Sequence, residues 1–387
     1  MKVVILSKAH VVGVYQRKLE ELARLPDVEL LALTPPYWRE ARVGVQRLER
    51  RHTEGYQLAV VPMLFNGHHH VHLYRRLWRH FRAFRPDIVH VDDEPYNLVT
   101  LHAALLARLA GARVVFFTWQ NLDRGYPPPF PQVEWSNYRL AAAAVAGNQE
   151  AVEVLRHKGY RGPVEVIPQF GVDPEFYAPG PAHTDKPPLI GFVGRLVPEK
   201  GADDLLAAFA RMRQPSRLDL VGTGSEQARL DAQAGRLGLR DRVRFRGAVP
   251  PAEMPEIYRA FDLLVVPSRT RSNWKEQFGR VIIEAMACGV PVIGSDSGEI
   301  PHVIGAPELV FPEGNIDALA RLLDELAADP ARRARLGEWA RRRVLAEFTQ
   351  ASVARRYYEL YRRVLGQGEP GDEGRWVSGR IDGDSRA

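Results

Sequence analysis

Two cations stand five residues apart in a loop that follows a short apolar run: Arg195 and Lys200 come after residues 189–193. Arginine presents a planar fork and lysine a point charge, and together they suit a diphosphate. Gly194 allows the backbone to approach a ligand closely, and a helix starting near Gly201 would present unpaired amides to an anion. Taken alone, these residues are better explained as a strand–helix turn with surface cations, because a single glycine-containing turn is a weak motif.

Two glutamates, Glu276 and Glu284, are separated by seven residues around a helix predicted over 278–287. Glu276 precedes this helix, and Glu284 interrupts its apolar face. A carboxylate among apolar side chains needs a hydrogen-bond partner, and a vicinal sugar diol can donate two hydrogen bonds. The alternative is that Glu276 caps the helix and Glu284 pairs with an arginine. The strand predicted after the helix favours the ligand-binding interpretation.

The elements that must position these residues follow an alternating pattern. Short apolar runs alternate with longer helix-like segments, which is typical of parallel sheets covered by helices. In the first half, strands are predicted over 3–6, 29–34, 58–63, 87–91, 113–118, 142–146 and 164–167, and helices over 15–25, 74–84 and 98–109. In the second half, strands are predicted over 189–193, 218–221, 243–246, 263–266, 290–293 and 309–311, and helices over 201–212, 226–237, 255–259, 278–287, 316–328 and 330–347.

The alternation divides the chain into two α/β domains. We expect one domain over 1–170 and another over 189–351, joined by a proline-rich linker over 171–188. Open parallel sheets bind ligands at the carboxyl ends of their strands, so the expected site is a cleft between the domains. A further helix is expected over 352–365, followed by a glycine-rich and acidic tail over 366–387 that we expect to be disordered.

Composition excludes several classes of protein. The chain has 387 residues, of which 45% are hydrophobic and 26% charged, as in an ordinary globular protein. Its single cysteine, Cys288, excludes an intramolecular disulfide framework and a cysteine-rich zinc site. No apolar stretch is long enough for a membrane span or a secretory signal. The net charge of +6 invites anionic partners, but no nucleic-acid-binding motif accompanies it.

In their order and spacing, four segments of the second half resemble the retaining glycosyltransferases of the GT-B architecture, glycosyltransferase family 4. The resemblance rests on the arginine–lysine loop, on the strand 261–268 (FDLLVVPS), on the two glutamates with seven residues between them, and on 311–315 (FPEGN). It implies two Rossmann-like domains, an interdomain cleft, and a final helix that packs back on the first domain. The first half matches mainly in architecture.

The resemblance also implies a donor site for a nucleotide-diphosphate sugar, UDP- or GDP-linked. Arg195 and Lys200 would hold the diphosphate, Glu284 the ribose hydroxyls and Glu276 the hexose, with Arg195, Lys200 and Glu276 as the catalytic set. The segment 246–249 would frame the base. Further donor contacts are implied at Gly194, Gly222, Gly224, Phe278, Gly279, Arg280 and Gly13. The family is usually metal-independent and needs no cofactor, and two fixed cations can offset the charge of the leaving diphosphate.

On the acceptor side, the loop after the first strand holds Gly13 where relatives usually have a glycine pair. His10 in the same loop is either an acceptor-side group or a histidine without a role. Gln120 stands where many relatives have a histidine. Gln can hydrogen-bond a sugar hydroxyl but cannot act as a base. Trp119 could stack on a sugar ring, although packing in the interior is the commoner role of such a residue.

Three consecutive carboxylates, Asp92, Asp93 and Glu94, end another predicted strand. We expect them to bind acceptor hydroxyls or to act as a base, and the alternative is a solvated loop with a helix cap. The histidines of 68–72 resemble a metal-binding tract, but alternation splits them over two faces, so a solvated loop is favoured. The basic amphipathic segment 73–85 could contact anionic lipid, although a helix docked on the sheet explains it better.

Together these expectations describe a cytoplasmic retaining glycosyltransferase that transfers a hexose-type sugar to a glycan, a lipid-linked acceptor or a small molecule, with peripheral contact at the inner membrane surface as a further possibility. The alternatives are a sugar-nucleotide epimerase or phosphorylase of the same architecture, and a non-enzymatic binding protein. Donor sugar, base, acceptor and oligomeric state do not follow from the residues.

Overall fold

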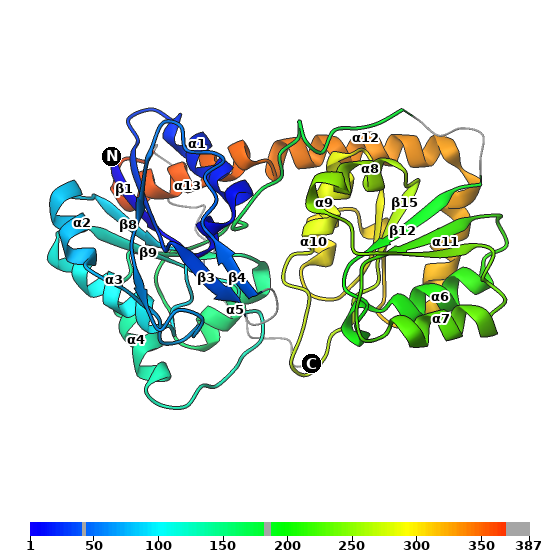
Figure 1. Cartoon of the computed structure of the whole chain (residues 1–387), viewed down its shortest axis with the longest axis horizontal. Helices are drawn as coiled ribbons and strands as arrows, with labels where there is room; N and C mark the ends of the chain where they lie inside the picture. Colours follow the sequence, from blue (N-terminus) through cyan, green and yellow to red (C-terminus); the bar gives the residue numbers. More distant parts are fainter. Residues whose placement is uncertain (41–43, 182–186, 369–387) are drawn as a thin grey trace, which may run out of the picture. The chain divides into compact units, whose positions relative to one another are not determined.

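A computed structural model describes residues 1–40, 44–181 and 187–368. The chain forms two compact units (Figure 1). Unit 1 consists of Met1–Gly171 and the chain from Gln350 onward, and unit 2 consists of Val172–Thr349. Each unit contains one large parallel sheet with helices on its faces, as the alternating pattern predicts.

Unit 1 is built on a seven-stranded parallel sheet in the order β11-β10-β9-β8-β1-β2-β5. Two small antiparallel hairpins, β3–β4 and β6–β7, accompany it. The strands are β1 (Lys2–Leu6), β2 (Glu29–Thr34), β3 (Tyr37–Glu40), β4 (Gly44–Arg47), β5 (Gln57–Val60), β6 (Met63–Leu64), β7 (Leu73–Tyr74), β8 (Ile88–Val91), β9 (Arg113–Thr118), β10 (Ala143–Ala146) and β11 (Val164–Val166). The helices are α1 (Arg17–Ala23), α2 (Leu77–Phe84), α3 (Leu98–Leu109), α4 (Phe130–Leu140), α5 (Gln149–His157) and α13 (Gln350–Val364).

The two faces of this sheet use alternate residues of the same strands, because successive strand side chains point to opposite sides. Val3 and Ile5 of β1 pack with α1 and α13, whereas Val4 and Leu6 pack with α2 and α3. Figure 1 shows α13 beside α1 on its face of the sheet. Both faces are therefore buried, as expected for strands that read as continuous apolar runs.

Unit 2 is built on a six-stranded parallel sheet in the order β14-β13-β12-β15-β16-β17. The strands are β12 (Leu189–Val193), β13 (Arg217–Val221), β14 (Val243–Gly247), β15 (Leu263–Val266), β16 (Val292–Ser295) and β17 (Val310–Phe311). The helices are α6 (Ala202–Arg211), α7 (Gln227–Arg236), α8 (Met254–Arg259), α9 (Arg280–Ala287), α10 (Ile300–Ile304), α11 (Ile316–Ala328) and α12 (Pro330–Glu347).

Strand order reverses direction at one point in each sheet. In unit 1 it reverses at β1, which lies between β8 and β2, and in unit 2 at β12, which lies between β13 and β15. At such a reversal, the loops that follow two neighbouring strands diverge and leave room for a ligand. The loops after β1 and β8, and those after β12 and β15, are the ones that hold most of the predicted site residues.

Several predicted boundaries are wrong, such as the strand predicted over 290–293, which is Val292–Ser295, and three of the differences have a clear local reason. The strand predicted over 58–63 is interrupted before Pro62 and continues as the hairpin strand β6. The helix predicted from residue 74 begins at Leu77, because Arg76 before it is left-handed, with φ of 58°. The helix predicted from Phe278 begins at Arg280, after Gly279, with φ of 76°.

The described part of the predicted linker packs on unit 2. The Tyr177 ring lies 6.0 Å from that of Tyr258 of α8, and Arg341 of α12 donates to the Tyr177 carbonyl over 3.2 Å. These contacts tie 172–181 to unit 2. Residues 182–186 of the linker and 369–387 of the predicted tail lie outside the described residues.

Candidate active site

The loops after β12 and β15 enclose a pocket of about 240 Å³ in unit 2. The first loop forms a 3₁₀ turn over Pro198–Lys200 before α6, and the second runs to the start of α9. The polar side chains around this pocket come from Arg195, Lys200, Ser268, Glu276 and Arg280. Two segments about eighty residues apart in the sequence therefore contribute to one site, and Gly194 and Gly279 line it as well.

Lys200 and Glu276 form an ion pair in this pocket. The Lys200 ammonium lies 2.6 Å from Glu276 Oε2 and 4.8 Å from the centre of the Trp274 ring. Ser268 Oγ donates to the same carboxylate oxygen over 2.9 Å. Lys200 is only 21% exposed, so it is not the surface cation of the alternative interpretation. The pocket therefore offers a cation and a carboxylate side by side to a ligand.

Glycines keep the backbone of these loops in place. Gly298 has φ of +58°, and a β-carbon there would lie 2.1 Å from the carbonyl oxygen of Glu276. Gly222 has φ of +134°, and its β-carbon would lie 1.9 Å from the carbonyl oxygen of Gly194. Gly222 is thus required by the packing of one strand-end loop on another, and Gly224 by a similar approach to Leu196. Their contact with a donor stays a prediction.

Glu284 lies in α9 and is buried, with protein partners on both oxygens. Tyr258 donates to Oε2 over 2.8 Å, and Arg280 lies 3.1 Å from Oε1. Burial raises the pKa of Glu284, and Arg280 and the tyrosine hydroxyls oppose that shift. The arginine pairing of the alternative interpretation is therefore present in the structure. A carboxylate has about four lone-pair positions, so these partners still leave acceptor capacity.

The other residues predicted to contact the donor differ in how exposed they are and in what they contact. The Arg195 side chain is about half exposed and lies 3.5 Å from Glu199. The Phe278 ring is buried, with its centre 5.8 Å from that of Phe348, and contact of this residue with a donor stays a prediction. In the segment predicted to frame the base, Arg246 is paired with Asp219.

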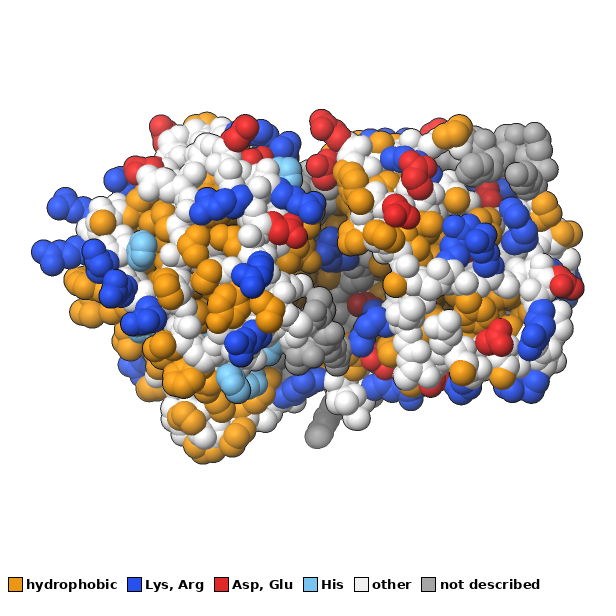
Figure 2. Space-filling view, viewed as in Figure 1, with side chains coloured by type: hydrophobic (Ala, Val, Ile, Leu, Met, Phe, Trp, Pro, Cys, Tyr) orange, Lys and Arg blue, Asp and Glu red, His pale blue; other side chains and the backbone are white. Residues whose placement is uncertain are grey.

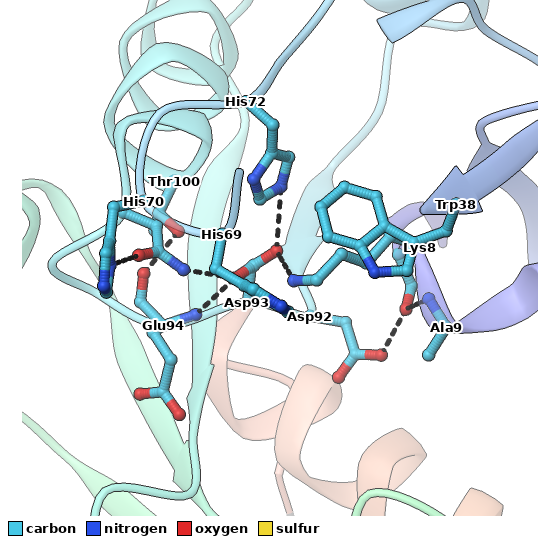
Figure 3. Close-up of polar contacts among 12 residues, drawn as sticks. Lys8, Ala9, Trp38, His69, His70, His72, Asp92, Asp93, Glu94 and Thr100 are labelled. Atoms are coloured by element: carbon cyan, nitrogen blue, oxygen red, sulfur yellow. Dashed lines mark hydrogen bonds and ion pairs between the residues drawn. The ribbon is translucent and has the colours of Figure 1, made fainter. Parts of the chain in front are cut away.

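In unit 1, Asp93 is the centre of a buried polar cluster (Figure 3). Its Oδ2 contacts the Lys8 ammonium and lies 3.2 Å from His72 Nε2, and its Oδ1 accepts from the Asn97 side chain over 2.6 Å. Burial alone would raise the pKa of Asp93, but Lys8 and His72 lower it further than burial raises it. The Lys8 ammonium also lies 5.5 Å from the Trp38 ring. The structure therefore contradicts the solvated loop of the alternative interpretation.

Glu94 joins the ends of two neighbouring strands. It accepts from Thr118 Oγ1, at the end of β9, over 2.6 Å and from the amide of the next residue, Trp119, over 2.9 Å. Burial raises its pKa to about 7, although both hydrogen bonds oppose that shift. The Trp119 ring packs on Gly147, and a β-carbon added to this glycine would lie 2.1 Å from the ring. The Trp119 indole NH donates to Gln169 Oε1 over 3.0 Å.

Asp92 and His10 lie deeper in the same unit. Asp92 accepts from Ser7 Oγ over 2.7 Å and from the Gln169 amide over 3.0 Å. His10 has no exposed area, which favours a structural role over contact with an acceptor. Burial lowers its pKa to about 3, with a further contribution from buried Lys18. The Gly13 amide, a predicted donor contact, donates a hydrogen bond to the Glu49 carboxylate over 3.2 Å.

Burial of His10 predicts a pH dependence of stability. Below its ordinary pKa of 6.5 the unfolded state binds a proton that the folded state takes up only near pH 3, so acid favours unfolding. Phenylalanine at this position removes that linkage. When the pH falls from 7 to 5, the wild type should lose about 2 kcal/mol of unfolding free energy through His10, and His10→Phe should not lose it. Urea unfolding at both pH values measures this gain, and a pH-independent difference would contradict it.

The histidines of 68–72 serve as structural groups rather than as a cluster. His72 is buried against Asp93, and His70 Nδ1 donates to Asn97 Oδ1 over 2.9 Å. The two histidine rings lie among different aromatic neighbours. Across 1–40, 44–181 and 187–368, no group of three or more histidine, cysteine, aspartate or glutamate side chains is placed to hold a metal ion.

Sequence reasoning missed the residues that support the predicted ones. Ser268 and Trp274 contact the Glu276–Lys200 pair, and Tyr258 contacts Glu284. In unit 1, Lys8 and Gln169 hold Asp93 and Asp92. Ser268 ends a strand in one of the family-like segments, which is a usable signal, whereas Gln169 carries no local signal.

Comparison with known proteins decides the family. A family model described as "Glycosyl transferases group 1" matches residues 175–343, and one described as "Glycosyltransferase Family 4" matches residues 16–176. A 2-deoxystreptamine glucosyltransferase from Streptomyces kanamyceticus is 30% identical over 319 residues, which cover 77% of each chain. The chain belongs to the group 1, family 4 glycosyltransferases. The resemblance stated above is thereby confirmed, and the protein is a glycosyltransferase.

Other relatives of this glycosyltransferase agree on the fold. A D-inositol 3-phosphate glycosyltransferase from Streptomyces bingchenggensis is 35% identical over 215 residues, 50% of this chain and 46% of that one. Anabaena Alr3699/HepE, solved in complex with UDP, has a TM-score of 0.69 at 20% identity and covers 93% of this chain and 99% of that chain. The predicted pair of Rossmann-like domains of the GT-B architecture is confirmed.

Proposed function

We propose that this glycosyltransferase moves a hexose-type sugar from a nucleotide-diphosphate sugar to an acceptor hydroxyl with retention of anomeric configuration. The observation that carries the proposal is the pocket in unit 2. There Lys200 and Glu276 face each other 2.6 Å apart, beside Arg195 and the start of α9. A cation next to a carboxylate matches a ligand with an anionic diphosphate next to a hydroxyl-rich sugar.

Each side chain has a separate role in this proposal. Lys200 and Arg195 stabilise the diphosphate as it leaves, in place of the charge that a metal ion would supply. Glu276 accepts hydrogen bonds from the hexose, and Glu284 from the ribose. Oriented charges of this kind cost no reorganisation during the reaction. No protein base is required if the departing phosphate oxygen accepts the proton of the acceptor hydroxyl, which fits glutamine at position 120.

The names of relatives guide the choice of substrates. Structures of Alr3699/HepE are titled as complexes with UDP and with UDP-glucose, which supports a uridine nucleotide as the first donor to test. GDP-linked donors stay in the proposal because a mannosyltransferase described as GDP-mannose-dependent is 31% identical over 282 residues. Cyclitols are the first acceptors to test, since relatives are named for 2-deoxystreptamine and D-inositol 3-phosphate.

A thermal-shift screen tests the donor site. UDP-glucose, UDP-N-acetylglucosamine and GDP-mannose are compared on the wild type and on Lys200→Ala. A donor at a hundredfold excess over its dissociation constant stabilises the fold by about 2.7 kcal/mol. One nucleotide sugar should raise the melting temperature of the wild type and have little effect on the variant. If none of the three shifts the wild type, these donors do not bind the proposed site.

The family favours transfer over the epimerase and phosphorylase alternatives. An epimerase would isomerise the sugar without releasing nucleoside diphosphate, and a phosphorylase would need inorganic phosphate. A transferase releases nucleoside diphosphate in step with acceptor consumption. A binding protein without enzymatic activity would bind the donor and turn over none of it.

Membrane contact through 73–85 stays a proposal. Leu77, Phe81 and Phe84 of α2 are buried in the core, so the apolar face of this helix is already covered. The outward face carries arginines and Trp78, which is 40% exposed, and Figure 2 shows Lys and Arg side chains projecting at the edge that α2 occupies. No helix within the described ranges is long and apolar enough to cross a bilayer.

Contact by such a face would be electrostatic and sensitive to salt. Wild-type protein should therefore sediment with phosphatidylglycerol vesicles at low ionic strength and less so at about 0.15 M salt. Arg79→Glu/Arg82→Glu should abolish sedimentation, whereas Arg211→Glu, on unit 2, should not. If the wild-type protein stays in the supernatant at low ionic strength, the proposed membrane contact is wrong.

A further inference from the structure

Gln120 follows β9 and is 8% exposed, and its side-chain oxygen is occupied by a lysine. Lys158, at the end of α5, donates from Nζ to Gln120 Oε1 over 3.1 Å. An ammonium group can only donate hydrogen bonds, so the atom that faces it must be the amide oxygen. The orientation of this amide therefore follows from the chemistry of its partner, which is how amide orientation is assigned in general.

Lys158 is itself held in place by a second set of contacts. Its ammonium lies 3.1 Å from both carboxylate oxygens of Glu134, and 5.8 Å and 5.6 Å from the ring centres of Tyr96 and Tyr126. Glu134 is also buried, and it accepts from Tyr138 over 2.8 Å. With an ion pair and two aromatic rings around it, the lysine has little freedom to leave Gln120.

The backbone of Gln120 is fixed as well. Its amide donates to Thr118 Oγ1 over 3.1 Å, and Thr118 in turn donates to Glu94 over 2.6 Å. Glu94 also accepts from the amide of Trp119. Both the main chain and the side-chain oxygen of Gln120 are therefore tied to groups that are buried or half-buried.

The NH₂ group of Gln120 is the one part of this side chain's amide that has no partner among the described residues. Nε2 is buried and has no hydrogen-bond partner among the described residues. A buried donor without an acceptor destabilises the fold, unless a ligand or an ordered water supplies the acceptor atom. A donor that is held fixed in this way is suited to a binding site, where groups are oriented before the ligand arrives.

We propose that Lys158 is a positioning residue that fixes the Gln120 amide so that its NH₂ group, and not its oxygen, is presented to an oxygen atom of a sugar or cyclitol. This inference rests on the proposed function for the identity of the ligand, but the positioning itself does not depend on it. The oxygen can belong to the donor hexose or to the acceptor, and separate Michaelis constants distinguish the two sources.

The kinetic test uses Gln120→Glu, in which the side chain keeps its shape and an oxygen for Lys158 but loses the NH₂ donor. With UDP-glucose as donor and 2-deoxystreptamine or D-inositol 3-phosphate as acceptor, this variant should raise KM for one of the two substrates about tenfold without lowering the melting temperature. Lys158→Met should raise the same KM, and adding Gln120→Glu to it should cause little further change. Constants within twofold of the wild type in Gln120→Glu would overturn the ligand role of the amide.

A second measurement is independent of turnover. In protein labelled with ¹⁵N-glutamine, the Gln120 NH₂ signals are assigned by their absence from Gln120→Glu. They should be narrow in the wild type, and shifted or broadened in Lys158→Met/Glu134→Gln, which removes the ion pair without leaving a buried carboxylate alone. If the Gln120 signals are the same in that variant, Lys158 does not position the amide, whatever the enzyme transfers.

Discussion

Lys200→Ala should lower kcat/KM for the nucleotide sugar by about a hundredfold to a thousandfold, the loss that follows removal of one fixed group from a site that stabilises developing charge. The ammonium lies 2.6 Å from Glu276 and lines the pocket in which we place the diphosphate. Its loss removes positive charge where the leaving group becomes most negative. Initial rates of nucleoside diphosphate release, at several donor concentrations, measure the effect.

Arg211→Ala is the matched control for this variant. Arg211 is the last residue of α6, whereas Lys200 lies just before the start of that helix, and Arg211 is paired with Asp317 at the surface. Exposed pairs of this kind contribute little, so activity should stay within about twofold. A folded Lys200→Ala variant with wild-type turnover would contradict the proposed role of the pocket.

Glu284→Gln should weaken nucleotide binding about tenfold to a hundredfold, while the fold is retained. The carboxylate accepts from Tyr258 and Arg280, and an amide in its place brings an NH₂ group toward these donors. The amide also loses acceptor positions for a ribose diol, and hydrogen bonds to a charged group are worth about 1.5–3 kcal/mol. Titration calorimetry with UDP and GDP measures the affinity directly.

Tyr258→Phe separates ligand binding from support of the fold. It removes the 2.8 Å hydrogen bond to Glu284 but leaves the carboxylate in place, so its effect should appear mainly in the melting temperature. If Glu284→Gln instead lowers the melting temperature and binds UDP and GDP as the wild type does, Glu284 is only the partner of Arg280.

The parts of the fold that were predictable are those that a local pattern encodes. β2, β9, β12 and β15 have the predicted bounds, because strands buried on both faces contain continuous apolar runs that are easily located. The hairpin β3–β4 could not be predicted in this way. It buries Trp38 but leaves most of its other side chains partly or fully exposed.

The candidate site was predictable where residue type and spacing carry the chemistry. Arg195, Lys200 and Glu276 were identified from their motifs, and they line one pocket. The partners of predicted residues depend instead on long-range packing. Asp93 meets His72 and Lys8 from three separate segments, and Gln120 meets Lys158 across 38 residues. No local pattern marks such pairs, because they form only when distant segments of the chain pack together.

The central claim is tested most directly by the reaction itself. The enzyme is incubated with the nucleotide sugar that stabilises it and with 2-deoxystreptamine or D-inositol 3-phosphate, and proton NMR follows both the nucleotide and the anomeric signal of the product. We expect one nucleoside diphosphate to be released per glycoside formed, with the anomeric configuration of the donor retained. A glycoside of inverted configuration, or an isomerised nucleotide sugar without release of diphosphate, would contradict it.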